Sequence, residues 1–123
     1  MKKVLIVEDE GIVSLDLKNT LSTFGKIESE VAFTAEDAMN MIKKNRPDLV
    51  LMDIGLKGNI DGIQAAEMVI KDHKIPLVFL TGFADSSTEK KANSISPDGY
   101  MTKPVDEDKL RKLIQQILFD PSC

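Results

Sequence analysis

Side chains that can do chemistry directly follow several apolar runs in this chain. They are carboxylates, a hydroxyl and an ammonium group: Glu8 and Asp9 after residues 4–7, Asp53 after 49–52, Thr81 after 77–80 and Lys103 at the end of 99–103. Continuous apolar runs of this length are typical of parallel strands covered by helices on both faces, and ligands bind beyond the carboxyl ends of such strands. The pattern therefore predicts that these side chains meet at one edge of a sheet.

The three carboxylates outnumber the single ammonium, so the predicted cluster favours a divalent cation. Two unit charges about 4 Å apart interact by about 4 kcal/mol at an effective dielectric of about 20. Hard carboxylate oxygens prefer Mg²⁺, or Mn²⁺ in its place. Zinc is disfavoured because the chain has one histidine and its single cysteine, Cys123, is the last residue.

A dication bound here could leave one oxygen of Asp53 free as a nucleophile. Aspartate can accept phosphoryl groups, and a phosphoryl group in transfer requires positive charge on its oxygens. The metal and Lys103 could supply that charge, and Thr81 could donate a hydrogen bond. Gly55 and Gly82 flank the predicted site without side chains, so backbone and phosphate could approach closely.

Strand and helix patterns alternate along the chain, which predicts a parallel α/β sheet. A weaker strand at 27–33 alternates apolar and polar residues at its start, which is typical of an edge strand. Apolar residues at helical spacing predict helices at 13–24, 35–42, 63–70 and 110–118, and Ile63, Ala66 and Ile70 form the expected apolar stripe of the third. A further helix is expected at 86–96, which has little apolar periodicity. Five strands and five helices account for the chain.

Local signals mark the ends of the predicted elements. Gly25 is expected to close the first helix as a left-handed cap, and Thr34 is expected to cap the second. Asp85 or Ser86 can cap the fourth helix, which is polar and is expected to be the shortest and least firmly held. The segment 54–60 is predicted as a loop because it is rich in glycine and asparagine.

Length and charge exclude several classes of protein. A chain of 123 residues suits one domain, which buries roughly two-thirds of its unfolded surface without needing a disulfide. A formal net charge of −4 argues against binding to nucleic acid. No apolar stretch reaches the length of a membrane span, and the N-terminal apolar run is too short for a signal peptide. We therefore expect a soluble, cytoplasmic protein that binds neither nucleic acid nor membrane by itself.

The ordered set Glu8-Asp9, Asp53, Thr81 and Lys103-Pro104 resembles the receiver domain of two-component response regulators, over essentially the whole chain. The resemblance implies an α/β, flavodoxin-like doubly wound fold, with a five-stranded parallel sheet of order 2-1-3-4-5 and five helices. It also implies a single receiver domain over residues 1–123. The chain departs from many relatives at Val105, where they have phenylalanine.

The same resemblance implies a role for each residue of the cluster. Asp53 would accept the phosphoryl group and bind the metal. Asp9 would bind Mg²⁺ directly and Glu8 through water, and the backbone carbonyl of Gly55 would complete the protein's share of the metal shell. Lys103 would pair with the phosphoryl group.

Two residues would form a switch. Thr81 would move toward the phosphoryl group and Tyr100 would turn inward with it, while the Lys103–Pro104 peptide would be cis. The implied function is a phosphorylation-controlled signalling switch, which catalyses only its own phosphorylation and dephosphorylation. A histidine kinase or phosphotransfer protein would supply the phosphoryl group, and a protein target or fused output domain would read the change. Phosphorylation could also lead to a homodimer.

Two other functions fit parts of the pattern. A phosphatase that works through an aspartyl phosphate would carry its nucleophile after the first strand and a second aspartate two residues on, which Glu8-Asp9-Glu10 does not match. A flavin-binding electron carrier would need a Ser/Thr/Gly-rich phosphate loop after the first strand, and this chain lacks one there. The sequence leaves open whether the domain acts alone or belongs to a longer regulator or hybrid kinase.

Overall fold

The computed structural model describes residues 1–56, 61–82 and 86–119. Five parallel strands form one sheet in the predicted order β2-β1-β3-β4-β5: β1 (Lys2–Val7), β2 (Ile27–Ala32), β3 (Leu49–Asp53), β4 (Leu77–Thr81) and β5 (Gly99–Thr102). The helices within these ranges are α1 (Gly11–Thr23), α2 (Ala35–Lys44), α3 (Gly62–Lys71), α4 (Ser86–Ser94) and α5 (Glu107–Ile114), followed by a π-helical turn, η1 (Gln115–Phe119). None of these helices is long and apolar enough to cross a membrane.

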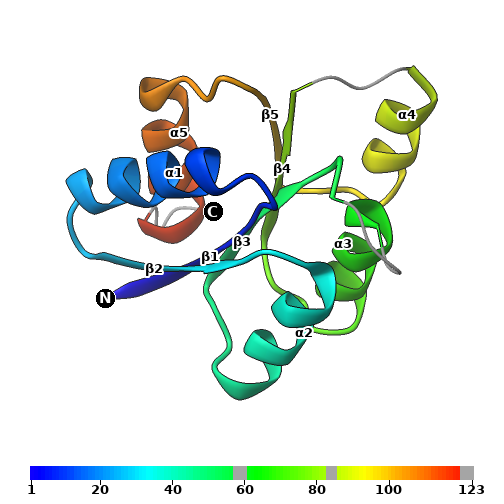
Figure 1. The fold of residues 1–123 in the computed structure, drawn as a ribbon, viewed down its shortest axis with the longest axis horizontal. Coiled ribbons are helices and arrows are strands. Elements are labelled where there is room, and N and C mark those ends of the chain that lie inside the picture. Colours follow the sequence, from blue (N-terminus) through cyan, green and yellow to red (C-terminus); the bar gives the residue numbers. More distant parts are fainter. Residues whose placement is uncertain (57–60, 83–85, 120–123) are drawn as a thin grey trace.

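Helices cover both faces of the sheet, with α1 and α5 on one face and α2, α3 and α4 on the other (Figure 1). Alternate residues of a strand point to opposite faces. Val4 and Ile6 therefore pack in the core under α1 and α5, whereas Leu5 and Val7 pack in the core under α2 and α3. β3 and β4 are buried at every residue, which explains their continuous apolar sequence.

The predicted edge strand and two predicted helix ends are confirmed. β2 lies at the edge of the sheet and has exposed residues between buried ones. Gly25 has a positive φ of 72°, and the Thr34 hydroxyl accepts a hydrogen bond from the backbone N–H of Asp37 at 3.1 Å. Part of the predicted loop, residues 57–60, and the alternative cap Asp85 lie outside the described residues.

The packed face of α3 differs from the predicted stripe of Ile63, Ala66 and Ile70. Both isoleucines are only partly buried, and the fully buried residues are Gly62, Ala65, Ala66 and Val69. Because most of these side chains are small, the helix can lie close to the sheet. Its first turn is thereby brought against the end of β3, beside Asp53.

The last two helices also differ from expectation. α4 buries only Ala92 among its nine residues, in keeping with a weakly held helix, but it is not the shortest. α5 has eight residues before the backbone continues as η1, whereas the apolar spacing predicts one regular helix as far as residue 118. Leu110 and Ile114 still provide the buried contacts of α5.

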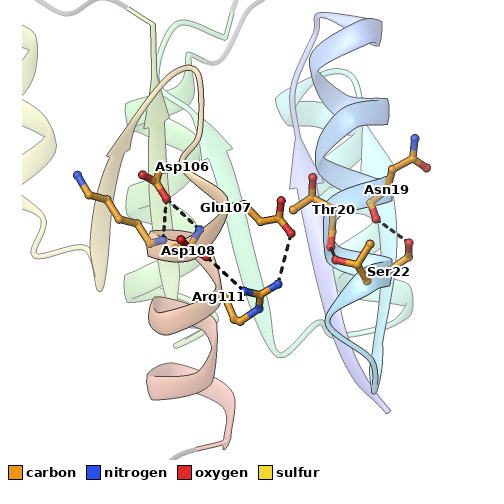
Figure 2. A network of polar contacts seen from close by, with 9 residues as sticks. Asn19, Thr20, Ser22, Asp106, Glu107, Asp108 and Arg111 are labelled. Carbon is orange, nitrogen blue, oxygen red and sulfur yellow. Dashed lines mark hydrogen bonds and ion pairs between the residues drawn. The ribbon is translucent and has the colours of Figure 1, made fainter.

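Figure 2 shows the polar contacts at the start of α5. The Asp106 carboxylate accepts hydrogen bonds from the backbone N–H groups of Asp108 and Lys109, at 2.9 and 3.1 Å. Arg111 pairs with Glu107 and Asp108, each at 3.3 Å. Exposed ion pairs of this kind contribute little, so the cap, worth about 1 kcal/mol, is the main local contribution.

Two aspartates fix the starts of β3 and β5 against their neighbours. The backbone N–H of Lys3 donates to Oδ2 of Asp48 at 2.8 Å, and the N–H of Asp48 donates back to the Lys3 carbonyl at 2.8 Å. Asp98 makes the same pair of bonds with Leu77, at 2.9 and 2.8 Å. Neither contact has a signal in the sequence pattern, because each joins residues that are far apart in the chain.

Asp48→Ala is expected to lower the free energy of unfolding by about 1 kcal/mol, because it leaves the partly buried N–H of Lys3 without its acceptor. Urea unfolding of the two proteins measures this difference. Asp48→Asn retains a side-chain oxygen at the same place and should keep most of the stability. An Asn variant as unstable as the Ala variant would contradict the hydrogen-bond explanation.

Candidate functional site

The ends of four adjacent strands bring the predicted residues together. Glu8 follows β1, Asp53 ends β3, Thr81 ends β4 and Lys103 follows β5. Asp53, Thr81 and Lys103 line one open pocket of about 410 Å³, together with Asp9. The predicted gathering at one sheet edge is therefore confirmed.

Lys103 is the electrostatic centre of the pocket. Its Nζ lies 2.7 Å from Oε2 of Glu8, 3.5 Å from Oδ2 of Asp53 and 3.8 Å from Oε1 of Glu10. Burial alone would lower the pKa of the Lys103 ammonium, but the hydrogen bond to Glu8 and the charges of the three carboxylates outweigh it and raise the pKa. Lys103 is therefore a firmly held cation.

Glu8 is completely buried, and both of its oxygens have donors. Oε2 accepts from Lys103, and Oε1 accepts from the backbone N–H of Glu10 at 3.2 Å. Burial raises the pKa of the Glu8 carboxyl, which the hydrogen bond from Lys103 offsets only in part. Glu8 thus serves first as the anchor that holds the lysine inside the site.

Asp53 is 5% exposed, and that small exposure opens into the pocket. Its Oδ1 accepts a hydrogen bond from the backbone N–H of Gly55 at 2.9 Å, and its Oδ2 faces Lys103. A Cβ added at Gly55 would lie 3.6 Å from Oδ1 of Asp53, which is an ordinary van der Waals contact. The Asp53 carboxylate is therefore oriented by Gly55 on one side and by Lys103 on the other, and it remains accessible from the pocket.

The hydroxyl of Thr81 has no hydrogen-bond partner, and it is the one such buried side-chain atom within the described part of the chain. A buried polar group without a partner costs free energy, commonly about 1–3 kcal/mol. Thr81 is 3% exposed and lines the same pocket as Asp53. Its placement fits a group that enters the pocket with acceptor oxygens.

Comparison with known protein families gives one match that spans all of these strand ends. The model of the response regulator receiver domain matches residues 4–115. The chain belongs to this family. Receiver domains are generally signalling modules rather than enzymes, and those of two-component systems act with histidine kinases.

Individual relatives agree with this family. The receiver domain of a modulated diguanylate cyclase from Desulfovibrio desulfuricans is 32% identical, with a TM-score of 0.88 over 95% of this chain and 93% of that chain. The probable transcriptional regulator ycf27 of Guillardia theta is 30% identical over 117 residues, 95% of this chain and 45% of that protein. The transcriptional regulatory protein PdtaR of Mycobacterium tuberculosis is 31% identical over 103 residues, 84% of this chain and 50% of that protein. The chain thus spans about half the length of these two regulators.

Receiver domains typically bind Mg²⁺, and the residues here suit that ion. Carboxylate oxygens of Glu8, Asp9 and Glu10 lie within 4.8 Å of one another. All of them are hard oxygen donors, and the pocket beside them also contains Asp53. Glu10 was not among the site residues predicted from the sequence, although it is the third consecutive acid after the first strand.

The receiver's predicted switch residues lie in neighbouring strands. Tyr100 on β5 is half-buried and meets Phe79 of β4 edge-on, with ring centroids 6.4 Å apart. The register pairs these two residues directly, and it pairs Thr81 with Thr102. The Lys103–Pro104 peptide is cis, as expected.

Proposed function

We propose that this receiver domain is a phosphorylation-controlled signalling switch in which Asp53 accepts a phosphoryl group in an Mg²⁺-dependent reaction. One observation carries the proposal: Asp53 opens into a pocket that also holds the Lys103 ammonium, 3.5 Å away, and the unpartnered Thr81 hydroxyl. A cation and a free donor beside one oriented carboxylate suit an incoming phosphoryl group.

The donor is a histidine kinase or phosphotransfer protein, and a small acyl phosphate or phosphoramidate can replace it in solution. An Asp53 oxygen attacks phosphorus, and the bond from phosphorus to the nitrogen of a phosphohistidine or phosphoramidate breaks; that nitrogen leaves with the electron pair and takes up a proton. With an acyl phosphate the bond from phosphorus to oxygen breaks, and a carboxylate leaves with the electron pair. Mg²⁺ supplies positive charge to the phosphoryl oxygens when it is bound. Asp9, Asp53 and the carbonyl of Gly55 would hold it directly, and Glu8 through water.

Lys103 and Thr81 respond to the new charge. Lys103 pairs with a phosphoryl oxygen in place of its contact with Asp53, and Thr81 moves to donate its hydroxyl. Phosphorylation adds negative charge at Asp53, and a local change of that kind can bias a two-state element. Tyr100 turning inward behind Thr81 is that element, and a partner protein or an output domain reads it.

The protein's wider role follows from this assignment. We infer a single receiver domain over residues 1–123 that works in the cytoplasm and catalyses only the gain and loss of its own phosphoryl group. Its partners are the phosphoryl donor and a downstream protein target or fused output domain. A homodimer formed on phosphorylation is one form in which the change could be read.

Asp53→Asn is expected to abolish phosphoryl uptake, because the amide lacks a nucleophilic carboxylate oxygen. The protein is incubated with Mg²⁺ and a small phosphoramidate, and intact-mass measurement follows the gain of one phosphoryl group. Asp16→Asn, an exposed acid on α1, is the matched control and should behave like the parent. Equal uptake by Asp53→Asn would overturn the proposal. Repeated turnover of a simple phosphoester by the parent would instead favour the phosphatase alternative.

A further inference from the structure

Glu10 stands at the N-cap of α1 but does not cap the helix. Its backbone is extended, with φ −92° and ψ 111°, and its side chain makes no capping hydrogen bond. The carboxylate lies instead 3.8 Å from Nζ of Lys103, while 66% of the side chain is exposed. The Glu10 carboxylate therefore interacts with the charge of Lys103 in the pocket and not with the backbone N–H groups at the start of α1.

The three adjacent acids differ in what they can offer a cation. Both oxygens of Glu8 already accept hydrogen bonds, and that side chain is fully buried. Asp9 and Glu10 are exposed, and the carboxylate oxygens of all three lie within 4.8 Å of one another. A cation that arrives from solvent therefore meets Asp9 and Glu10 first.

A second observation indicates that this pocket accommodates a ligand. The buried Thr81 hydroxyl, without a partner, lines the same pocket as Asp9, Glu10 and Lys103. The pocket thus combines an exposed acidic side with an inner side that has a lysine and a free donor. This arrangement suits a dication and an anion that occupy the pocket together.

We propose that Glu10 is a positioning residue of the cation site, an inference that rests on the proposed function. Its carboxylate pairs with Lys103 when no cation is bound. It turns to the cation, beside Asp9, when one binds. Lys103 keeps its 2.7 Å contact with Glu8, and the affinity for Mg²⁺ is higher than Glu8, Asp9 and Asp53 would give alone.

Titration with MgCl₂ alone, followed by calorimetry, tests this without any phosphoryl donor. Glu10→Gln is expected to weaken binding about tenfold, the lower end of the effect of groups that support a metal site. Asp9→Asn should weaken it further. Glu28→Gln removes one exposed charge near the start of β2, at the opposite end of the sheet, and should bind as the parent does.

Mg²⁺ binding by these variants distinguishes a failure of the role proposed for Glu10 from a failure of the proposed function on which it rests. Parent-like binding by Glu10→Gln, with weakened binding by Asp9→Asn, would overturn the role of Glu10 and leave the proposed function standing. An equal loss in Glu28→Gln and Glu10→Gln would also overturn it, since only net charge would matter. Parent-like binding by Asp9→Asn would contradict the metal site of the proposed function itself.

Discussion

Lys103→Met should lower the free energy of unfolding by about 3 kcal/mol near neutral pH, because it leaves a buried carboxylate without its counter-charge. Glu8 is fully buried, and Lys103 is its partner at 2.7 Å. The two exposed ion pairs that Arg111 makes with Glu107 and Asp108 would give much smaller losses. Urea unfolding at pH 8 measures the difference between parent and variant.

The size of this loss should depend on pH. Burial raises the pKa of Glu8 above its ordinary value of 4.5, and removing the hydrogen bond from Lys103 raises it further. In the pH range between 4.5 and that raised pKa, the folded state binds more protons than the unfolded state, so stability falls as the pH rises. The pKa of Lys103 is raised above its ordinary value of 10.5. In the parent, the contribution of this lysine to the free energy of unfolding therefore does not change with pH below pH 10.5. The deficit of Lys103→Met should therefore be smaller at pH 5 than at pH 8.

A double variant identifies the cause of the loss. Glu8→Gln combined with Lys103→Met removes both charges, so it should recover part of the stability that Lys103→Met loses. A deficit that is the same at both pH values, and that the double variant does not reduce, would show that Glu8 is not the source. The lysine would then act mainly through the packing of its methylene groups.

The sequence was sufficient to predict the parallel α/β sheet and its polar edge because both depend on simple periodicity, whereas the strand order followed only from the resemblance to receiver domains. β3 and β4 are buried on both faces, so their runs are continuously apolar and end where Asp53 and Thr81 reach the site. Pairings within the site were harder to predict. Whether Lys103 bonds to Glu8 or Asp53 depends on side-chain conformations and burial, which residue order does not encode.

Other features depend on contacts between segments that are distant in the sequence. Nothing in the sequence distinguishes Asp48 from other aspartates that follow a proline, and only the structure shows its hydrogen bonds to Lys3. The apolar spacing after Leu110 fits a regular helix, yet the backbone widens at η1. The tight approach of Gly62 to Asp53 was equally invisible, because it depends on how closely α3 lies against the sheet.

Gly62→Ala should lower the free energy of unfolding by about 2–3 kcal/mol, as overpacking against a rigid group does. A Cβ at this position would lie 2.3 Å from the backbone oxygen of Asp53 and 3.1 Å from that of Ile54. Neither oxygen can turn aside as a flexible side chain could, so the end of β3 or the first turn of α3 must move. Because the displaced residue is the proposed phosphoacceptor, phosphoryl uptake should fall together with stability.

Gly11→Ala provides the matched control, since Gly11 and Gly62 are the first residues of α1 and α3. A Cβ at Gly11 would meet no atom within 4 Å, so alanine there should be neutral or stabilise the protein by about 0.5–1 kcal/mol. Thermal unfolding and intact-mass measurement of phosphoryl uptake compare the two variants with the parent. Parent-like behaviour of Gly62→Ala would show that α3 can withdraw from the sheet without cost. In that case the close packing of α3 would not be what holds Asp53 in its place.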